Sequence, residues 1–165
     1  MAPNFEKLLA LFGDAKVEMV VIGGVAMNAQ GSAYVTFDLD LCYRRTKENI
    51  VRMCDALAPY QPRLRGAPEN LPFRLDAETV KRGLNFTLTT SLGDLDLLGE
   101  VTGIGSYDAA LQTSEWREIE GKKYLVLSLA GLIQAKRAAG RKKDLNALPE
   151  LEALRDLKER MGGKE

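Results

Sequence analysis

The stretch GGVAMNAQGSAYVTFDLDLCYRRT, residues 23–46, decides the fold of this chain. A glycine pair follows a buried-looking apolar run, and after a short apolar segment two aspartates, Asp38 and Asp40, stand one residue apart in a strand-like stretch. Side chains alternate along a strand, so both carboxylates lie on one face and Phe37, Leu39 and Leu41 lie on the other, core face. Two like charges on one strand face repel each other, and the rest of the sequence must supply what offsets them.

A second D-L-D stands in GDLDLL, residues 93–98, where Asp94 and Asp96 also share one face. Aspartates two residues apart on a strand lie about 6.6 Å apart along it. If the two strands pair, their carboxylates converge on one point, and oxygen-only ligands favour Mg²⁺ or Mn²⁺. The alternative is two exposed strand faces with solubilising aspartates. Aspartate is depleted in strands, which favours the metal site slightly.

The composition limits the chemistry that this chain can perform. The 165 residues include no histidine and two cysteines, so histidine-based catalysis and a Cys/His zinc site are excluded. Cys42 and Cys54 lie in apolar company and are interpreted as buried free thiols. The formal net charge is zero, which disfavours broad, sequence-independent binding of nucleic acid by the chain as a whole. The absence of a membrane-length apolar run or a signal-peptide pattern favours a cytoplasmic protein with no membrane partner.

The pattern along the chain predicts one α+β domain with a mixed sheet, over residues 1–165. Its core covers about 15–128 and its C-terminal helical region covers 129–161. We expect a loop over 59–72 because it holds four of the six prolines, and 73–76 is at most a short strand. Pro149 suits the first turn of a last helix. Helices are predicted over 4–14, 25–31, 46–58, 77–82, 106–112, 128–139, 141–148 and 149–161, and strands over 17–24, 35–43, 84–90, 94–101 and 117–128, the last as a hairpin.

Two further features suit phosphate binding. Gly23 and Gly24 end a strand and open a helix, where backbone N–H groups can hold phosphate oxygens; the alternative is a tight turn. In the basic helix, Lys136 continues an apolar stripe and either follows the helix edge or points into a polar site. Arg141 follows, and Asp144 can pair with either and hold it in place.

These motifs together resemble the nucleotidyltransferase superfamily with the DNA polymerase β-like fold, and most closely the small AbiEii-like, minimal nucleotidyltransferase subgroup. The matching stretches are VIGGVAMNAQG (21–31), YVTFDLDL (34–41), GDLDLL (93–98) and GLIQAKRAAGRKKD (131–144), which occur in the family's order over most of the chain. The resemblance implies a nucleotidyltransferase-like mixed sheet with helices packed around it. It also implies Mg²⁺-dependent transfer of a nucleoside monophosphate from an NTP to a hydroxyl, with release of pyrophosphate.

The resemblance also assigns roles to residues. It implies Asp38, Asp40 and Asp96 as metal ligands and catalytic carboxylates in two-metal chemistry, and makes Asp94 a bystander or a group that supports the ligands without binding the metal itself. The residues that it implies for binding the nucleotide are Gly23, Gly24, Thr36, Lys136 and Arg141.

Other interpretations remain open. Tyr34 stands where the family pattern has arginine, and this favours an inactive relative that serves as a binding or regulatory partner, as in toxin–antitoxin systems. FDLD also opens the haloacid-dehalogenase motif, but Cys42 stands where that motif has Thr or Val. The acceptor is open among tRNA, a protein hydroxyl and a small molecule, and so small a chain is a candidate for a homodimer that completes its site.

Overall fold

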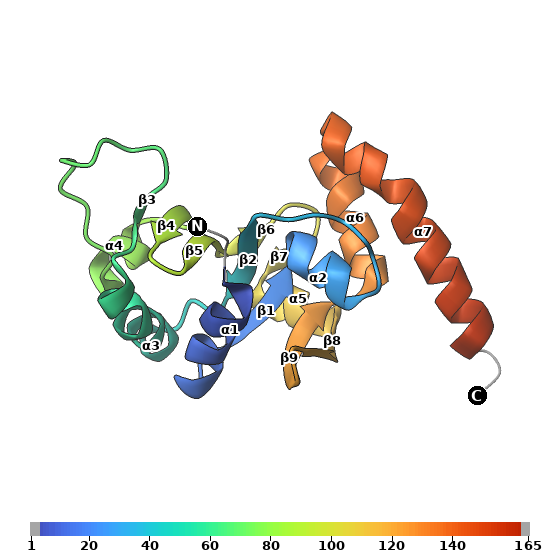
Figure 1. Ribbon diagram of the computed structural model, residues 1–165, viewed down its shortest axis with the longest axis horizontal. Helices are drawn as coiled ribbons and strands as arrows, with labels where there is room; N and C mark the ends of the chain where they lie inside the picture. The colour runs from blue at the N-terminus through green and yellow to red at the C-terminus, as the bar shows by residue number, and fades with distance from the viewer. Residues whose placement is uncertain (1–3, 163–165) are drawn as a thin grey trace.

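The computed structural model describes residues 4–162 and has a mixed seven-stranded sheet in the order β3-β4-β5-β2-β1-β9-β8 (Figure 1). Strands β2 and β5, and β1 and β9, pair in parallel, whereas the other neighbours are antiparallel. A separate two-stranded ribbon joins β6 to β7. The predicted α+β class with a mixed sheet and C-terminal helices is confirmed, and the number of domains stays a prediction.

The strands are β1 (Met19–Ile22), β2 (Asp38–Tyr43), β3 (Arg63–Leu64), β4 (Asn85–Thr90), β5 (Gly93–Leu98), β6 (Glu100–Val101), β7 (Gly105–Ser106), β8 (Ser114–Ile119) and β9 (Lys122–Leu127). The helices are α1 (Phe5–Asp14), α2 (Gly23–Ala29), α3 (Lys47–Leu57), the 3-10 turn η1 (Ala58–Tyr60), α4 (Ala77–Arg82), α5 (Tyr107–Gln112), α6 (Leu129–Ala139) and α7 (Lys142–Gly162).

Caps and apolar stripes explain where the main helices begin. The side chains of Asn4, Thr46 and Ser128 accept hydrogen bonds from backbone N–H groups in the first turns of α1, α3 and α6. The buried faces of these helices supply Leu8, Phe12, Ile50, Met53, Leu132 and Ile133 to the core. Along β2 and β5, Leu39, Leu41, Leu95 and Leu97 are all buried, so the opposite faces of these strands are free to carry polar groups.

Three sequence predictions are wrong in detail. The segment 59–72 holds β3, which pairs with β4, whereas 73–76 forms no strand. Strand β2 begins at Asp38, so Phe37 precedes the sheet and is exposed rather than part of the core face. Pro149 lies inside the continuous helix α7 instead of beginning a new one. Each correction reflects pairing or packing between distant parts of the chain, which a local pattern does not contain.

Helix α6 packs against α7, and these C-terminal helices stand at one end of the sheet, whereas α3 and α4 lie at the other (Figure 1). Cys42 and Cys54 are free and buried, as predicted. Within residues 4–162, no helix is both long and apolar enough to cross a membrane.

Candidate active site

The pairing of β2 with β5 places the two D-L-D motifs side by side. The parallel register aligns Asp38 with Asp94 and Asp40 with Asp96. Because side chains alternate on both strands, all four carboxylates lie on the same face of the sheet, opposite the buried leucines. The predicted convergence of the two strands is therefore present.

Three of the four carboxylates form a compact cluster. One carboxylate oxygen each from Asp38, Asp40 and Asp96 lies within 4.8 Å of the others, and this is the one cluster of potential metal ligands that residues 4–162 contain. Asp40 Oδ1 is buried and has no hydrogen-bond partner. An unpartnered buried carboxylate oxygen beside two other acids is costly by itself but suits a hard divalent cation. The residues present therefore fit a metal ion of the Mg²⁺ type.

The pKa values of these carboxylates reflect the same cost of placing three acids together. Burial, followed by the charges of Asp38 and Asp96, raises the pKa of Asp40 from 3.8 to about 8. Burial also raises the pKa of Asp96, although the Arg65 guanidinium beside it lowers that pKa in part. A bound divalent cation would reverse this balance, because its charge favours the ionised carboxylates.

Close packing explains both glycines at the start of α2. Gly23 has φ +66°, and a Cβ there would lie 2.3 Å from Asp40 Oδ2. A Cβ at Gly24 would lie 2.6 Å from Cβ of Thr36. The strand-to-helix turn therefore approaches the carboxylates and Thr36 more closely than any other residue type allows.

Thr36 fixes the orientation of the first aspartate. Its Oγ1 donates to the backbone oxygen of Asp38 at 3.0 Å and lies 3.3 Å from Asp38 Oδ1. The side chain thus links the segment before β2 to the first carboxylate of the triad.

The basic pair on α6 and α7 is held by one buried acid. Asp144 has no exposed surface and accepts from Lys136 Nζ at 3.2 Å and from Arg141 Nε at 2.7 Å, as the sequence suggested. Burial raises the pKa of Asp144, but the hydrogen bonds from Arg141 and Lys136 outweigh it, so that the net pKa lies below its usual value. Both cations are thereby fixed at the junction of the two helices.

All eight site residues predicted from the sequence line one cleft of about 330 Å³: Gly23, Gly24, Thr36, Asp38, Asp40, Asp96, Lys136 and Arg141. Tyr34, where the family pattern has arginine, lines it as well. The structure therefore brings the predicted residues together, and their roles stay predictions.

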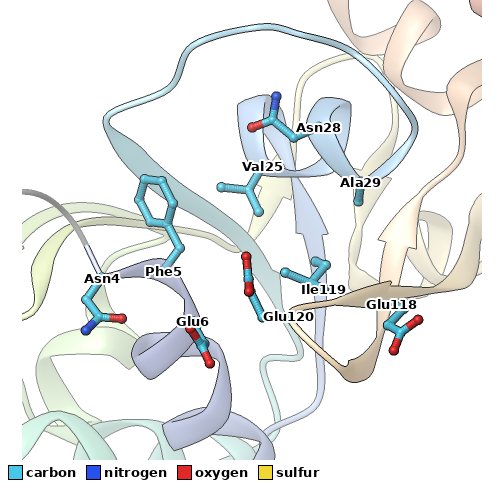
Figure 2. A pocket seen from close by; sticks show the side chains of 9 residues that line it. All are labelled: Asn4, Phe5, Glu6, Val25, Asn28, Ala29, Glu118, Ile119 and Glu120. Carbon is cyan, nitrogen blue, oxygen red and sulfur yellow. The ribbon is translucent and has the colours of Figure 1, made fainter.

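A larger cavity of about 470 Å³ lies between α1, α2 and the β8–β9 hairpin (Figure 2). Its lining residues include Glu6, Glu118 and Glu120, and it shares no lining residue with the triad cleft. Since it brings none of the predicted site residues together, we assign the candidate active site to the smaller cleft.

Sequence reasoning missed Arg65, which contacts the carboxylate face. Its guanidinium lies 2.8 Å from Asp96 Oδ1, 3.3 Å from Asp94 Oδ2 and 3.8 Å from Asp38 Oδ2. Arg65 stands in a proline-rich segment without periodicity, and only the pairing of β3 with β4 brings it to this face. Asp94 lies outside the triad, where it contacts Arg65 and accepts from Thr89 Oγ1 at 3.2 Å.

Comparisons with known proteins agree with the fold. No family model and no curated protein matches the chain. One similar solved structure is TM1012 of Thermotoga maritima, provisionally described as a nucleotidyltransferase, with 15% identity, coverage of 94% of this chain and 93% of that one, and a TM-score of 0.49. Another is ANT(2")-Ia in complex with adenylyl-2"-tobramycin, with 16% identity, coverage of 94% and 95%, and a TM-score of 0.55. The second likeness shows that this chain has the nucleotidyltransferase fold that its motifs predicted.

Proposed function

We propose that this protein is a divalent-metal-dependent nucleotidyltransferase that moves a nucleoside monophosphate from an NTP to a hydroxyl acceptor. The observation that carries the proposal is the meeting of Asp38, Asp40 and Asp96 in the same cleft as Gly23, Gly24 and the two anchored cations. The nucleotidyltransferase fold adds to it. Arg65 offsets the charges of Asp38 and Asp96 in part, but Asp40 Oδ1 stays buried without a partner, so the triad is costly without a metal ion.

In this proposal, each part of the cleft has a separate task. Asp38, Asp40 and Asp96 hold Mg²⁺ or Mn²⁺, which when bound supplies charge stabilisation to the attacking and leaving oxygens. Lys136 and Arg141 attract the triphosphate, and Asp144 holds both of them in position.

The phosphate end of the nucleotide has a second set of partners. The turn at Gly23 and Gly24 offers backbone N–H groups without side chains in the way, so a phosphate can approach it closely. Thr36 keeps the carboxylate of Asp38 oriented toward the shared site. These groups bind and orient the substrate before the hydroxyl of the acceptor attacks.

A transfer assay tests the proposal. The full chain is incubated with Mg²⁺ or Mn²⁺ and each labelled NTP, against total tRNA, candidate partner proteins and small hydroxyl compounds including tobramycin, and both pyrophosphate release and label transfer are followed. Asp38→Asn should abolish release because it removes a metal ligand. Asp55→Asn is the matched control, since Asp55 is exposed on α3 and lines no part of the cleft.

The competing function is that of an inactive binding or regulatory partner, which Tyr34 favours because it replaces the expected arginine in the cleft. Binding of Mn²⁺ and NTP without transfer to any acceptor would overturn the enzyme and support this function. The AbiEii-like subgroup, the toxin–antitoxin role, the cytoplasmic location and the homodimer stay predictions alongside it.

A further inference from the structure

Arg65 lies where the candidate metal site meets the edge of the sheet. It directly follows β3, and its backbone N–H donates to the carbonyl of Thr87 on β4 at 3.0 Å. This hydrogen bond holds the backbone of Arg65 beside β4, so that only β4 separates it from β5. From there, Nη2 donates to the carbonyl of Leu88 at 2.7 Å and to Asp96 Oδ1 at 2.8 Å. Arg65 is therefore anchored through its backbone N–H and through Nη2, and its guanidinium is not free in solvent.

Two of its three acidic partners belong to the triad. Asp96 Oδ1 and Asp38 Oδ2 face the guanidinium at 2.8 Å and 3.8 Å. Both carboxylates would also be ligands of a divalent cation. A cation held by this triad would stand beside the permanent positive charge of Arg65. Two like charges that share the same carboxylates repel strongly in a partly buried site.

Asp94 gives the guanidinium a partner outside the triad. Its Oδ2 lies 3.3 Å from Arg65 Nε, and its Oδ1 accepts from Thr89 Oγ1 at 3.2 Å, which fixes this carboxylate on β5. Arg65 Nε is buried and forms no hydrogen bond in the present arrangement, so a shift toward Asp94 would satisfy it.

We propose that Arg65 is a positioning residue that holds Asp38 and Asp96 when no metal is bound, competes with the divalent cation for them, and withdraws onto Asp94 when the cation enters. This inference rests on the proposed metal site and adds to it a control of metal affinity. It also gives Asp94 a role as the retaining partner of Arg65.

Mn²⁺ titration of the metal-free full chain, followed by the electron paramagnetic resonance of free Mn²⁺, tests the inference without any transfer activity. Arg65→Gln should tighten Mn²⁺ binding about tenfold or more, because it removes the competing charge. Arg65→Lys keeps the positive charge but lacks the planar, two-pronged guanidinium. Its Mn²⁺ affinity should fall between those of the wild type and Arg65→Gln. Arg63→Gln is the matched control: Arg63 is exposed on β3, forms no ion pair among the described residues, and should leave the affinity within about twofold.

A double-mutant cycle tests the role of Asp94. Asp94→Asn should weaken Mn²⁺ binding in the wild-type background, where it leaves Arg65 on the triad. The Asp94→Asn substitution should have much less effect in the Arg65→Gln background, because Asp94 then has no arginine to hold away from the triad. Equal effects in the two backgrounds would overturn this part of the inference.

The remaining outcomes separate this inference from the proposed function. Unchanged or weaker Mn²⁺ binding by folded Arg65→Gln and Arg65→Lys would overturn the competition and leave the metal site intact. Binding by Arg65→Gln alone, with none by the wild type, would support the competition in its strongest form. Absence of Mn²⁺ binding in every variant would overturn both the competition and the metal-dependent transferase.

Discussion

At the scale of single residues, Asp40 is the carboxylate of the site whose charged form the fold disfavours most strongly. Its pKa of about 8 in the folded protein lies above the ordinary value of 3.8, and it faces Asp38, Asp96 and Lys136. A raised folded-state pKa means that the folded protein binds this proton more tightly than the unfolded chain does. The associated stability is present below about pH 4 and is lost as the pH rises toward 8.

Asp40→Asn should therefore stabilise the metal-free protein at pH 8 by a few kcal/mol, on the order of several degrees in Tm, and much less at pH 5. Thermal unfolding in the presence of EDTA at both pH values measures the effect. Asp55→Asn is the control, since Asp55 is exposed on α3 away from the triad, and this variant should change the Tm little. A lower Tm for Asp40→Asn at pH 8 would contradict the predicted repulsion.

Gly23 is a second residue whose identity the site dictates. Alanine there would combine strain at φ +66° with a Cβ placed 2.3 Å from Asp40 Oδ2. We expect Gly23→Ala to displace Asp40 and reduce Mn²⁺ affinity about tenfold or more, because one of its ligands moves. Gly121→Ala is the matched control, since Gly121 has φ +82° with no atom within 4 Å of the added Cβ. Equal Mn²⁺ affinities for the two variants would show that the close approach is unimportant for the site.

At the scale of elements, the junction of α6 and α7 depends on Asp144. This carboxylate is fully buried, pairs with Lys136 and Arg141, and accepts from the backbone N–H of Arg141 at 3.2 Å, just before α7 begins. Removing one member of a buried ion pair leaves an uncompensated charge, here that of Lys136, whose side chain is only 17% exposed.

Asp144→Ala should thus cost about 3 kcal/mol in the free energy of unfolding, measured by urea denaturation followed by circular dichroism. Arg137→Ala serves as the comparison, because Arg137 on α6 is exposed and its partner Glu152 on α7 is only partly buried, so the expected cost is below about 1 kcal/mol. Similar costs for the two variants would contradict a special role of Asp144 at the junction.

The elements that the sequence predicted best are those whose signals are local. Caps at Asn4, Thr46 and Ser128 give the starts of three helices, and the D-L-D alternation gives the polar face of the two central strands. The same period of two in both strands predicted four carboxylates on one face, and the resemblance to the nucleotidyltransferase superfamily singled out Asp38, Asp40 and Asp96 among them. Strand β3 was not predictable, because its two residues adopt strand conformation only through their pairing with β4.

The same contrast explains the other differences. Phe37 continues the alternation of β2 by sequence, but the strand begins one residue later and leaves the ring exposed. Pro149 lacks a backbone N–H and usually ends or begins a helix, yet α7 runs through it while packing against α6. Arg65 had no usable signal, since the short R-L-R stretch at 63–65 in a proline-rich segment does not indicate which strand it lies beside.

At the scale of the whole molecule, the cleft unites segments that are far apart in the sequence. The turn before α2, strands β2 and β5 and the α6–α7 junction supply its residues. The order of the sheet makes the strands neighbours, and the packing of α2 against β2 and α6 brings the helical parts to them. A cation bound here would link β2 to β5. Because it would bind the folded chain and have no assembled site in the unfolded chain, it must raise the stability of the entire fold.

Mg²⁺ or Mn²⁺ should consequently raise the Tm of the wild type. At 100 times the dissociation constant the gain is about 2.7 kcal/mol, or roughly 5–10 °C for a chain of this size. The measurement is thermal unfolding over a metal series, with EDTA as reference. Asp38→Asn should lose most of the shift because it removes a ligand, whereas the exposed-site control Asp55→Asn should retain it. An undiminished shift in Asp38→Asn would place the stabilising cation outside the triad and contradict the assignment of the metal site to Asp38, Asp40 and Asp96.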